Sequence, residues 1–214
     1  MSQIQVDTIT ESTSGTGTTV EGVKLKDNNI EMPSSGLIKN SNNQQIGSLV
    51  KITSGTVSSG TSIDFDNCFS NDFRNYKIFT NTTGTVSLEA RLRYNGSNNT
   101  SSVYGSMLHY VYIEGSTSAS HDRTTNGQHW RWTYQASGGS NNIVGAEHTV
   151  YAPYESDKGT VMTGLCMSQW NNDNSLAGYM SGHYSTTGSF DGISILDTAG
   201  DNWTGEVAIY GIVK

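Results

Sequence analysis

Carboxylate pairs are the first candidates for chemistry in this sequence. Asp64 and Asp66, in "SIDFDN", lie two residues apart on an expected strand and would share one of its faces. Such a pair could serve a glycosidase, which needs two carboxylates at a defined separation, or could bind calcium weakly. The glycine and distal glutamate of an EF-hand loop are missing, so solvated acids at the entry to a domain are favoured. Asp197 and Asp201, in "LDTAGDN", are expected to form a loop.

Motifs of the common enzyme classes are absent. The sequence has no GxSxG, no Walker A pattern and no HExxH. One histidine per chain on a trimer axis could supply three metal ligands, but nothing singles one out, and no metal or other cofactor is expected. The five histidines are scattered through β-type sequence: His109, His121, His129, His148 and His183. We therefore expect a protein that is not an enzyme.

Aromatic residues alternate with polar ones in "GQHWRWTYQ", residues 127–135. Trp130, Trp132 and Tyr134 would share one face of a strand, either as a ligand-binding row or as part of a core or subunit interface. Packing is favoured, because large aliphatic residues are scarce in this chain. His129 and Arg131 would then face outward from the same strand.

Polar loops are the expected places for ligand binding, since exposed aromatic and hydrogen-bonding side chains on a rigid β-scaffold suit sugars. Three loops qualify: "STSASHDRTTNGQ", "ASGGSNN" and "QWNNDNSLAGYMSGHYSTTG". The receptor-binding candidates are His121, Arg123, His129, Arg131, Trp170 and Tyr184.

Strands are expected throughout the chain, because Gly, Asn, Ser or Thr interrupts nearly every helical window. "VSLEARLRYNG" alternates apolar and polar residues and stops at Asn95-Gly96, which predicts a half-buried antiparallel strand followed by a tight turn. "SSVYGSMLHYVYIEG", "TVMTGLCMSQW", "DGISILD" and "GEVAIYGIVK" are similar. Many short strands with turn-rich spacers predict an all-β fold, a jelly-roll-like antiparallel β-sandwich.

Composition narrows the classes of partner. Charged residues make up 14% of the 214, the formal net charge is −7, and lysine and arginine do not cluster, so nucleic acid is not an expected partner. No apolar run approaches 18 residues and none follows Met1, so neither membrane insertion nor a signal peptide is expected. Cys68 and Cys166 are expected to be buried free thiols rather than a bridge.

Residues 1–55 differ from the rest. "QIQVDTITE" and "TTVEGVKLKDNNIE" are short strand-like pieces with few large side chains, which would have to pair with other chains or with a partner. A boundary is expected near the turn-like "SGTVSSGTS", giving an N-terminal segment of residues 1–55 and a β-sandwich domain of residues 56–214. The attachment candidates of the segment are Ile4, Val6, Ile9, Val20, Val23 and Leu25.

Both ends of the chain resemble one family. "VDTITESTSGTGTTVEGVKLKDNNI" resembles the N-terminal segment of tail-fibre and appendage proteins from tailed phages, especially those of marine bacteria and cyanobacteria. "FDNCFSNDFRNYKIFTN", "TVSLEARLRYNG", "GAEHTVYAP" and the closing "FDGISILDTAGDNWTGEVAIYGIVK" are similar to the C-terminal domain of the same proteins.

The resemblance implies a homotrimeric virion protein. Its N-terminal segment would attach to other tail, neck or head proteins, and its C-terminal domain would contact a host surface glycan or receptor. The chain has no coiled coil or shaft repeat, so a purely architectural head fibre, neck or tail connector is an alternative. A polysaccharide depolymerase appendage is another.

Overall fold

The computed structural model describes residues 18–20, 23–26, 29–31, 49–83, 87–114, 116–134, 143–169 and 175–212. Every regular element in these ranges is a β-strand, as the all-β prediction requires. The same ranges contain no helix that could cross a membrane. The chain divides into two compact units, Met1–Gly47 and Ser48–Lys214, so the second unit starts at Ser48 rather than at residue 56.

The N-terminal unit contains a small antiparallel sheet. Its strands are β1 (Thr18–Val20), β2 (Val23–Lys26) and β3 (Asn29–Glu31), in the order β1-β2-β3. Strands expected within "TTVEGVKLKDNNIE" are thereby confirmed. Val20 and Val23 are register partners on β1 and β2, and Leu25 lies on β2. The other three attachment candidates, Ile4, Val6 and Ile9, lie outside the described residues.

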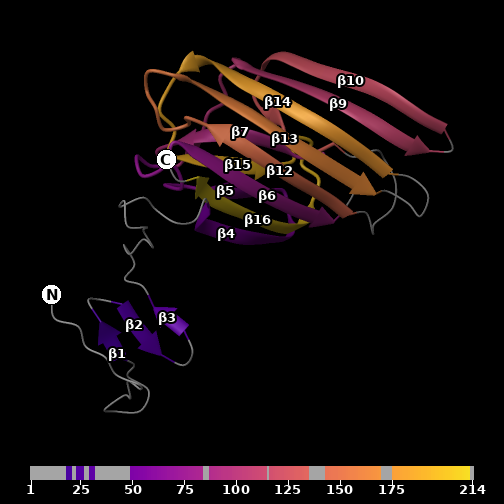
Figure 1. The fold of residues 1–214 in the computed structure, drawn as a ribbon. Helices are drawn as coiled ribbons and strands as arrows, with labels where there is room; N and C mark the ends of the chain where they lie inside the picture. Colours follow the sequence, from indigo (N-terminus) through magenta and orange to yellow (C-terminus); the bar gives the residue numbers. More distant parts are fainter. Residues whose placement is uncertain are drawn as a thin grey trace. The chain divides into compact units, whose positions relative to one another are not determined.

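The second unit consists of two antiparallel sheets (Figure 1). The larger sheet has the order β10-β9-β14-β13-β12-β6-β16-β4, and the smaller has the order β11-β7-β15-β5, with β8 paired to β7. The strands are β4 (Leu49–Gly60), β5 (Ser62–Phe65), β6 (Asn75–Thr83), β7 (Glu89–Tyr94), β8 (Ser97–Asn98), β9 (Tyr104–Glu114), β10 (Ser116–Gly127), β11 (Trp130–Arg131), β12 (Ile143–Tyr151), β13 (Gly159–Gln169), β14 (Ser175–Thr187), β15 (Gly192–Leu196) and β16 (Trp203–Ile212).

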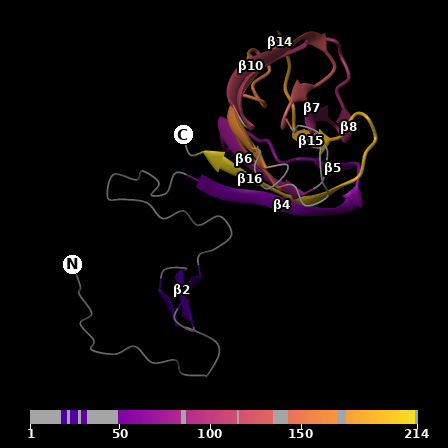
Figure 2. The ribbon, with the colours of Figure 1, turned by 90° about the vertical axis from the view of Figure 1, so that its right-hand side faces the viewer.

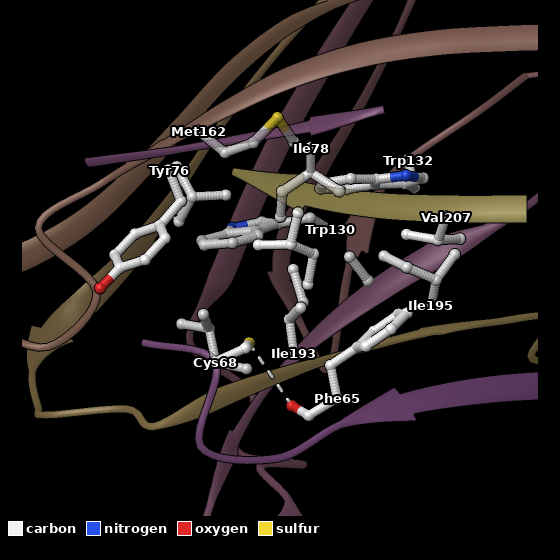
Figure 3. Packing of buried hydrophobic residues seen from close by; sticks show 14 of the residues in the cluster. Phe65, Cys68, Tyr76, Ile78, Trp130, Trp132, Met162, Ile193, Ile195 and Val207 are labelled. Carbon is white, nitrogen blue, oxygen red and sulfur yellow. Dashed lines mark hydrogen bonds between the residues drawn. The ribbon is translucent and has the colours of Figure 1, made fainter. Parts of the chain in front are cut away.

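The main core lies between the two sheets, where the larger sheet bends around the smaller one (Figure 2). Ile78 and Val207 of the larger sheet pack in the same cluster as Ile193 and Ile195 of the smaller sheet (Figure 3). β15 is buried along all five of its residues. It lies between β7 and β5 in the smaller sheet, and its Ile193 and Ile195 face the main core. Burial of this apolar surface is the main contribution to folding free energy.

Trp130 and Trp132 are fully buried in this core, which confirms packing for the two tryptophans of "GQHWRWTYQ" (Figure 3). Among residues 128–134, Trp130 and Arg131 form a strand, β11. The backbone then leaves the sheet, and the Trp132 and Thr133 amides both donate to the carbonyl of Leu88. Tyr134 is half-buried and packs on a second, smaller cluster made of Leu108, Val144, Ala146, Cys166 and Met180.

The turn expected at Asn95-Gly96 is confirmed. Tyr94 and Ser97 are register partners, and the two residues between them have φ of 48° and 74°. Positive φ at both central positions is the signature of a type I′ hairpin turn, which favours Asn-Gly. The strand before it is not half-buried as expected, because the reverse face of β7 is covered too: Glu89 and Arg93 are 9% and 5% exposed.

Several expected turns and loops are strands. Residues 54–60 of "SGTVSSGTS" belong to β4, and a chain reversal follows before β5 starts at Ser62. "STSASHDRTTNGQ" is nearly all β10, and β14 starts at Ser175 inside the third expected loop. Ser and Thr are compatible with strands when a neighbouring strand satisfies their backbone groups, as β9 does for β10 and β16 does for β4.

Candidate functional site

The β9–β10 hairpin forms one edge of the larger sheet and carries two of the receptor-binding candidates (Figure 1). His121 and Arg123 are exposed on β10, where their register partners on β9 are His109 and Met107. All four side chains lie on the outer face, the face of the larger sheet turned away from the smaller one. Leu108, between His109 and Met107, is fully buried on the inner face.

Four basic or titratable side chains gather on the outer face at this edge, and we call them the cationic corner: His109, His121, Arg123 and His183. β14 supplies His183, whose register partner on β9 is Gly105. Asp122 is the only acid among residues 104–113, 119–127 and 175–187, and it alternates to the inner face. At neutral pH Arg123 carries the one formal positive charge of the corner, on a protein whose formal net charge with neutral histidines is −7.

A hollow of about 310 Å³ lies within the cationic corner. Gly105 makes room for the His183 ring beside it, since a Cβ at this position would collide with that ring. Arg123 and His183 line the hollow together with the hydroxyls of Thr125 and Ser181. These groups can donate and accept hydrogen bonds, and the guanidinium suits a carboxylate or sulfate.

Three tyrosines cluster on the inner face of the same hairpin. Tyr110 stacks on Tyr134 with ring centroids 4.9 Å apart, and Tyr112 meets Tyr110 edge-on at the same separation. A hydrogen bond with Ser120 lowers the pKa of Tyr110. Tyr110 and Tyr134 pack against the second apolar cluster, so their packing role is explained without a ligand.

Arg131 contacts this tyrosine cluster instead of projecting freely as expected. Its Nη2 lies 2.6 Å from Oδ2 of Asp122, and its guanidinium carbon lies 5.9 Å from the Tyr134 ring centroid. His129 is also only half-exposed, and its Nδ1 is buried without a hydrogen-bond partner among the described residues. Burial lowers the pKa of His129. Neither side chain is a freely exposed binding group.

Tyr184 is wrong as an exposed binding candidate, because its side chain is only 6% exposed. Its ring packs against Tyr104 and Phe190 in the main core, and its hydroxyl accepts a hydrogen bond from Nδ2 of Asn99 at 2.9 Å. The remaining candidate, Trp170, and the loop "ASGGSNN" lie outside the described residues.

The acid pair Asp64 and Asp66 is bound by one arginine. Nη1 of Arg93 lies 2.9 Å from Asp64 and Nε lies 2.8 Å from Asp66. The arginine also donates to Oδ1 of Asn98 and to the carbonyl of Gly96. Both acids are partly exposed, at 43% and 41%, but they are paired with one guanidinium rather than simply solvated, and they link β5 to the β7–β8 hairpin.

The expected loop at Asp197 and Asp201 and the expected free cysteines agree with the structure. Asp201 donates its amide to Oδ1 of Asp197, as expected of a loop. Cys68 and Cys166 are free and buried, as expected. Burial raises the pKa of Cys68 to about 12 and that of Cys166 to about 11, so both thiols are protonated at neutral pH.

Apolar side chains cover the middle of the outer face, next to the cationic corner. We call these residues the apolar strip: Phe79, Val111, Leu165, Met167 and Tyr179. Leu165 and Met167 of β13 are 58% and 66% exposed and line two hollows. The first hollow, of about 510 Å³, extends over Phe79 and Ala208, and the second, of about 460 Å³, extends over Val111 and Tyr179.

Sequence reasoning missed His109, His183 and the apolar strip. His183 and most of the apolar strip come from strands that are far from β9 in the chain, and His109 becomes the neighbour of His121 only through the register of the β9–β10 hairpin. The period-two pattern of each strand predicts which of its residues share a face, but it does not show which strands are adjacent.

Comparisons with known proteins give no family: no family model matches the sequence, and neither a curated protein nor a solved structure is significantly similar to the chain.

Proposed function

We propose that this protein is a structural and adhesive component of a tailed-phage virion, a tail fibre or appendage whose body contacts the host cell surface. The observation that carries the proposal is the division of one broad sheet face into an apolar strip and a cationic corner. A rigid β-sheet that presents both features has a surface for subunit contact beside a surface for a ligand. The sequence resemblance at both ends of the chain supports the same function.

The cationic corner supports a host-surface glycan as the ligand. Arg123 can bind a carboxylate or sulfate group, and the Ser181 and Thr125 hydroxyls suit sugar hydroxyls. A negatively charged polysaccharide fits this combination better than a neutral one.

The apolar strip supports a homotrimer. Exposed apolar side chains that gather on one face are common at subunit interfaces, and Leu165 and Met167 of β13 lie on the same face as Phe79 of β6. Glu147 of β12, paired with Lys77, lies between Phe79 and Leu165. Burial of this strip between copies would remove it from water. The small sheet of residues 18–31 would attach the trimer to other tail, neck or head proteins through Val20, Val23 and Leu25.

The body is proposed to be jelly-roll-like because the chain passes repeatedly between the two sheets. β4, β6 and β16 belong to the larger sheet, whereas β5, β7 and β15 belong to the smaller one. All pairings are antiparallel in the part of the chain that the structure describes.

Binding of the purified full chain to host cells, and to the polysaccharide extracted from them, tests the proposal. Arg123→Ser is expected to reduce binding at least about tenfold, because a hydrogen bond to a charged group contributes about 1.5–3 kcal/mol. Lys51→Ser removes an exposed cation from β4, the opposite edge strand, and is the matched control.

Two results would contradict the proposal. Absence of cell binding, with the protein located at the head or neck by cryo-EM, would favour the architectural alternative. Release of oligosaccharides from the polysaccharide by the purified protein would favour the depolymerase alternative.

A further inference from the structure

His109 and His121 face one another across the β9–β10 hairpin. They are direct register partners, and their ring centroids lie 6.1 Å apart at an interplanar angle of 38°. Both residues are exposed on the outer face. Among the described residues, neither ring has a hydrogen bond or an ion pair, so its nitrogens are available. We propose that these two imidazoles bind one divalent transition-metal ion, Zn²⁺ or a chemically similar ion.

The spacing of the rings is close to that of a chelate. With Zn–N bonds of about 2.0–2.1 Å and a tetrahedral angle, the centroids of two bound imidazoles lie about 5 Å apart. The strand register holds the two backbones in place, and rotation of the exposed side chains closes the remaining distance of about 1 Å. No strand has to move for the ion to bind.

The donor set selects the type of metal. Two neutral imidazoles suit Zn²⁺, Ni²⁺ or Cu²⁺, whereas Ca²⁺ and Mg²⁺ need oxygen ligands. The described residues contain no group of three or more His, Cys, Asp and Glu side chains that could hold a metal. The site therefore has two protein ligands, and water fills the other positions. It is an open, surface-exposed site rather than a closed structural one.

The other histidines described by the structure are excluded from this site. The His183 ring lies across Gly105 on the other side of β9, and its register position is four residues from His109 along that strand. His148 is fully buried in the main core, and Nδ1 of His129 is buried. Specificity for His109 and His121 therefore follows from their cross-strand pairing.

Bound metal would fasten the edge strand to its neighbour. β10 pairs only with β9 among the described strands, so the ion would add a second connection to the hydrogen-bonded ladder. A ligand that binds the folded protein but not the unfolded chain raises the unfolding temperature. The site is thus a metal-dependent clamp on the hairpin that carries the cationic corner.

Calorimetric titration of ZnCl₂ into the full chain, purified without a histidine tag and treated with EDTA, tests the proposal. We expect saturable binding of one ion per chain at pH 7.5. His109→Gln and His121→Gln should each weaken binding at least about tenfold, since even the loss of an outer-shell partner costs about 10–100-fold. His183→Gln, at another exposed histidine of the same face, should leave binding unchanged.

A second measurement separates metal binding from folding. Circular dichroism should show the same fold for all three variants, and Zn²⁺ should raise the unfolding temperature of the wild type and of His183→Gln only. Binding should weaken as the pH falls from 7.5 to 5.5, because protons compete for the imidazoles. Absence of saturable binding by the wild type, or equal losses in all three variants, would overturn the proposal. Neither measurement involves host cells, so the outcome is independent of the proposed adhesive function.

Discussion

The imidazole of His148 stacks on the indole of Trp132 in the main core, with ring centroids 4.0 Å apart and an interplanar angle of 27°. Both side chains are fully buried. Nε1 of Trp132 donates to Oγ1 of Thr80, but neither nitrogen of His148 has a hydrogen-bond partner among the described residues. Burial lowers the pKa of His148 to about 3, so the ring is neutral at physiological pH.

Stability is therefore expected to fall in mild acid. The unfolded chain has a histidine pKa near 6.5 and binds a proton there, whereas folded His148 does not bind it until pH 3. Its contribution to stability is fully present above pH 6.5 and is lost as the pH falls from 6.5 toward 3. The slope from this group approaches about 1.4 kcal/mol per pH unit within that range. Urea unfolding at a series of pH values, followed by tryptophan fluorescence, measures it.

His148→Leu is the informative variant. Replacing a buried polar group that lacks partners by an apolar one of similar size is expected to be neutral or stabilising at pH 7. The acid slope between pH 6.5 and 4.5 should become shallower than in the wild type, because the titrating group is gone. His183→Leu changes an exposed histidine and should keep the wild-type slope. Equal slopes in the wild type and His148→Leu would show that His148 is not the acid-sensitive group.

Arg93 is expected to be a major contributor to stability. Arg93→Met leaves Asp64 and Asp66 near one another without their shared counter-charge and removes the donor to the Gly96 carbonyl. Loss of one partner of a buried ion pair costs about 3–5 kcal/mol, and since both acids are partly exposed we expect about 2–3 kcal/mol here. Chemical denaturation provides the measurement.

Arg91→Met is the control for that experiment. Arg91 lies on the same strand and makes one side-chain hydrogen bond, from Nε to the carbonyl of Gln128. Its loss should cost about 0.5–1.5 kcal/mol. If both variants lost the same stability, the contacts of Arg93 with the two acids would not be what stabilises β5 against the β7–β8 hairpin.

Tyr184→Phe should affect stability and leave binding to host cells unchanged. The substitution removes the acceptor for Nδ2 of Asn99 and keeps the ring contacts with Tyr104 and Phe190. A neutral hydrogen bond contributes about 0.5–1.5 kcal/mol, which thermal unfolding can resolve. A loss of cell binding with an unchanged unfolding temperature would show that Tyr184 takes part in binding.

The sequence predicted the class of fold because the signals were local. Alternation of apolar and polar residues identified most strands. Asn95-Gly96 predicted a tight turn because both residues readily adopt positive φ. The burial of Trp130 and Trp132 followed from the scarcity of aliphatic residues in the same chain. The strands and the turn needed only neighbours within a few positions, and the burial of the tryptophans needed only the composition of the chain.

The site could be predicted only in part because it depends on strand adjacency. His121 and Arg123 were correct as exposed residues, but the sequence placed them in a loop and could not pair them with His109 and Met107. Ser and Thr were read as turn residues in β10, although pairing with β9 satisfies their backbone groups. The burial of Tyr184 could not be predicted either, because it results from packing against Tyr104 and Phe190.

The apolar strip gives the test of subunit assembly. Leu165→Glu places a carboxylate on a residue that is 58% exposed in the single chain and lies at the junction of the two hollows. The single chain tolerates a charge there, whereas an interface between copies would have to bury it without a partner, at a cost of several kcal/mol. We expect the wild type to have the mass of a trimer by light scattering and Leu165→Glu to be a folded monomer.

Tyr94→Glu is the matched control for assembly. Tyr94 is 56% exposed, similar to Leu165, but it ends β7 in the smaller sheet, away from the strip. The same change of charge there should leave the trimer intact, because Tyr94 is not part of the outer face. A wild type that stays a folded monomer at all concentrations would contradict the homotrimer. A Leu165→Glu variant that still assembles would place the subunit contacts elsewhere and leave the strip free for another partner.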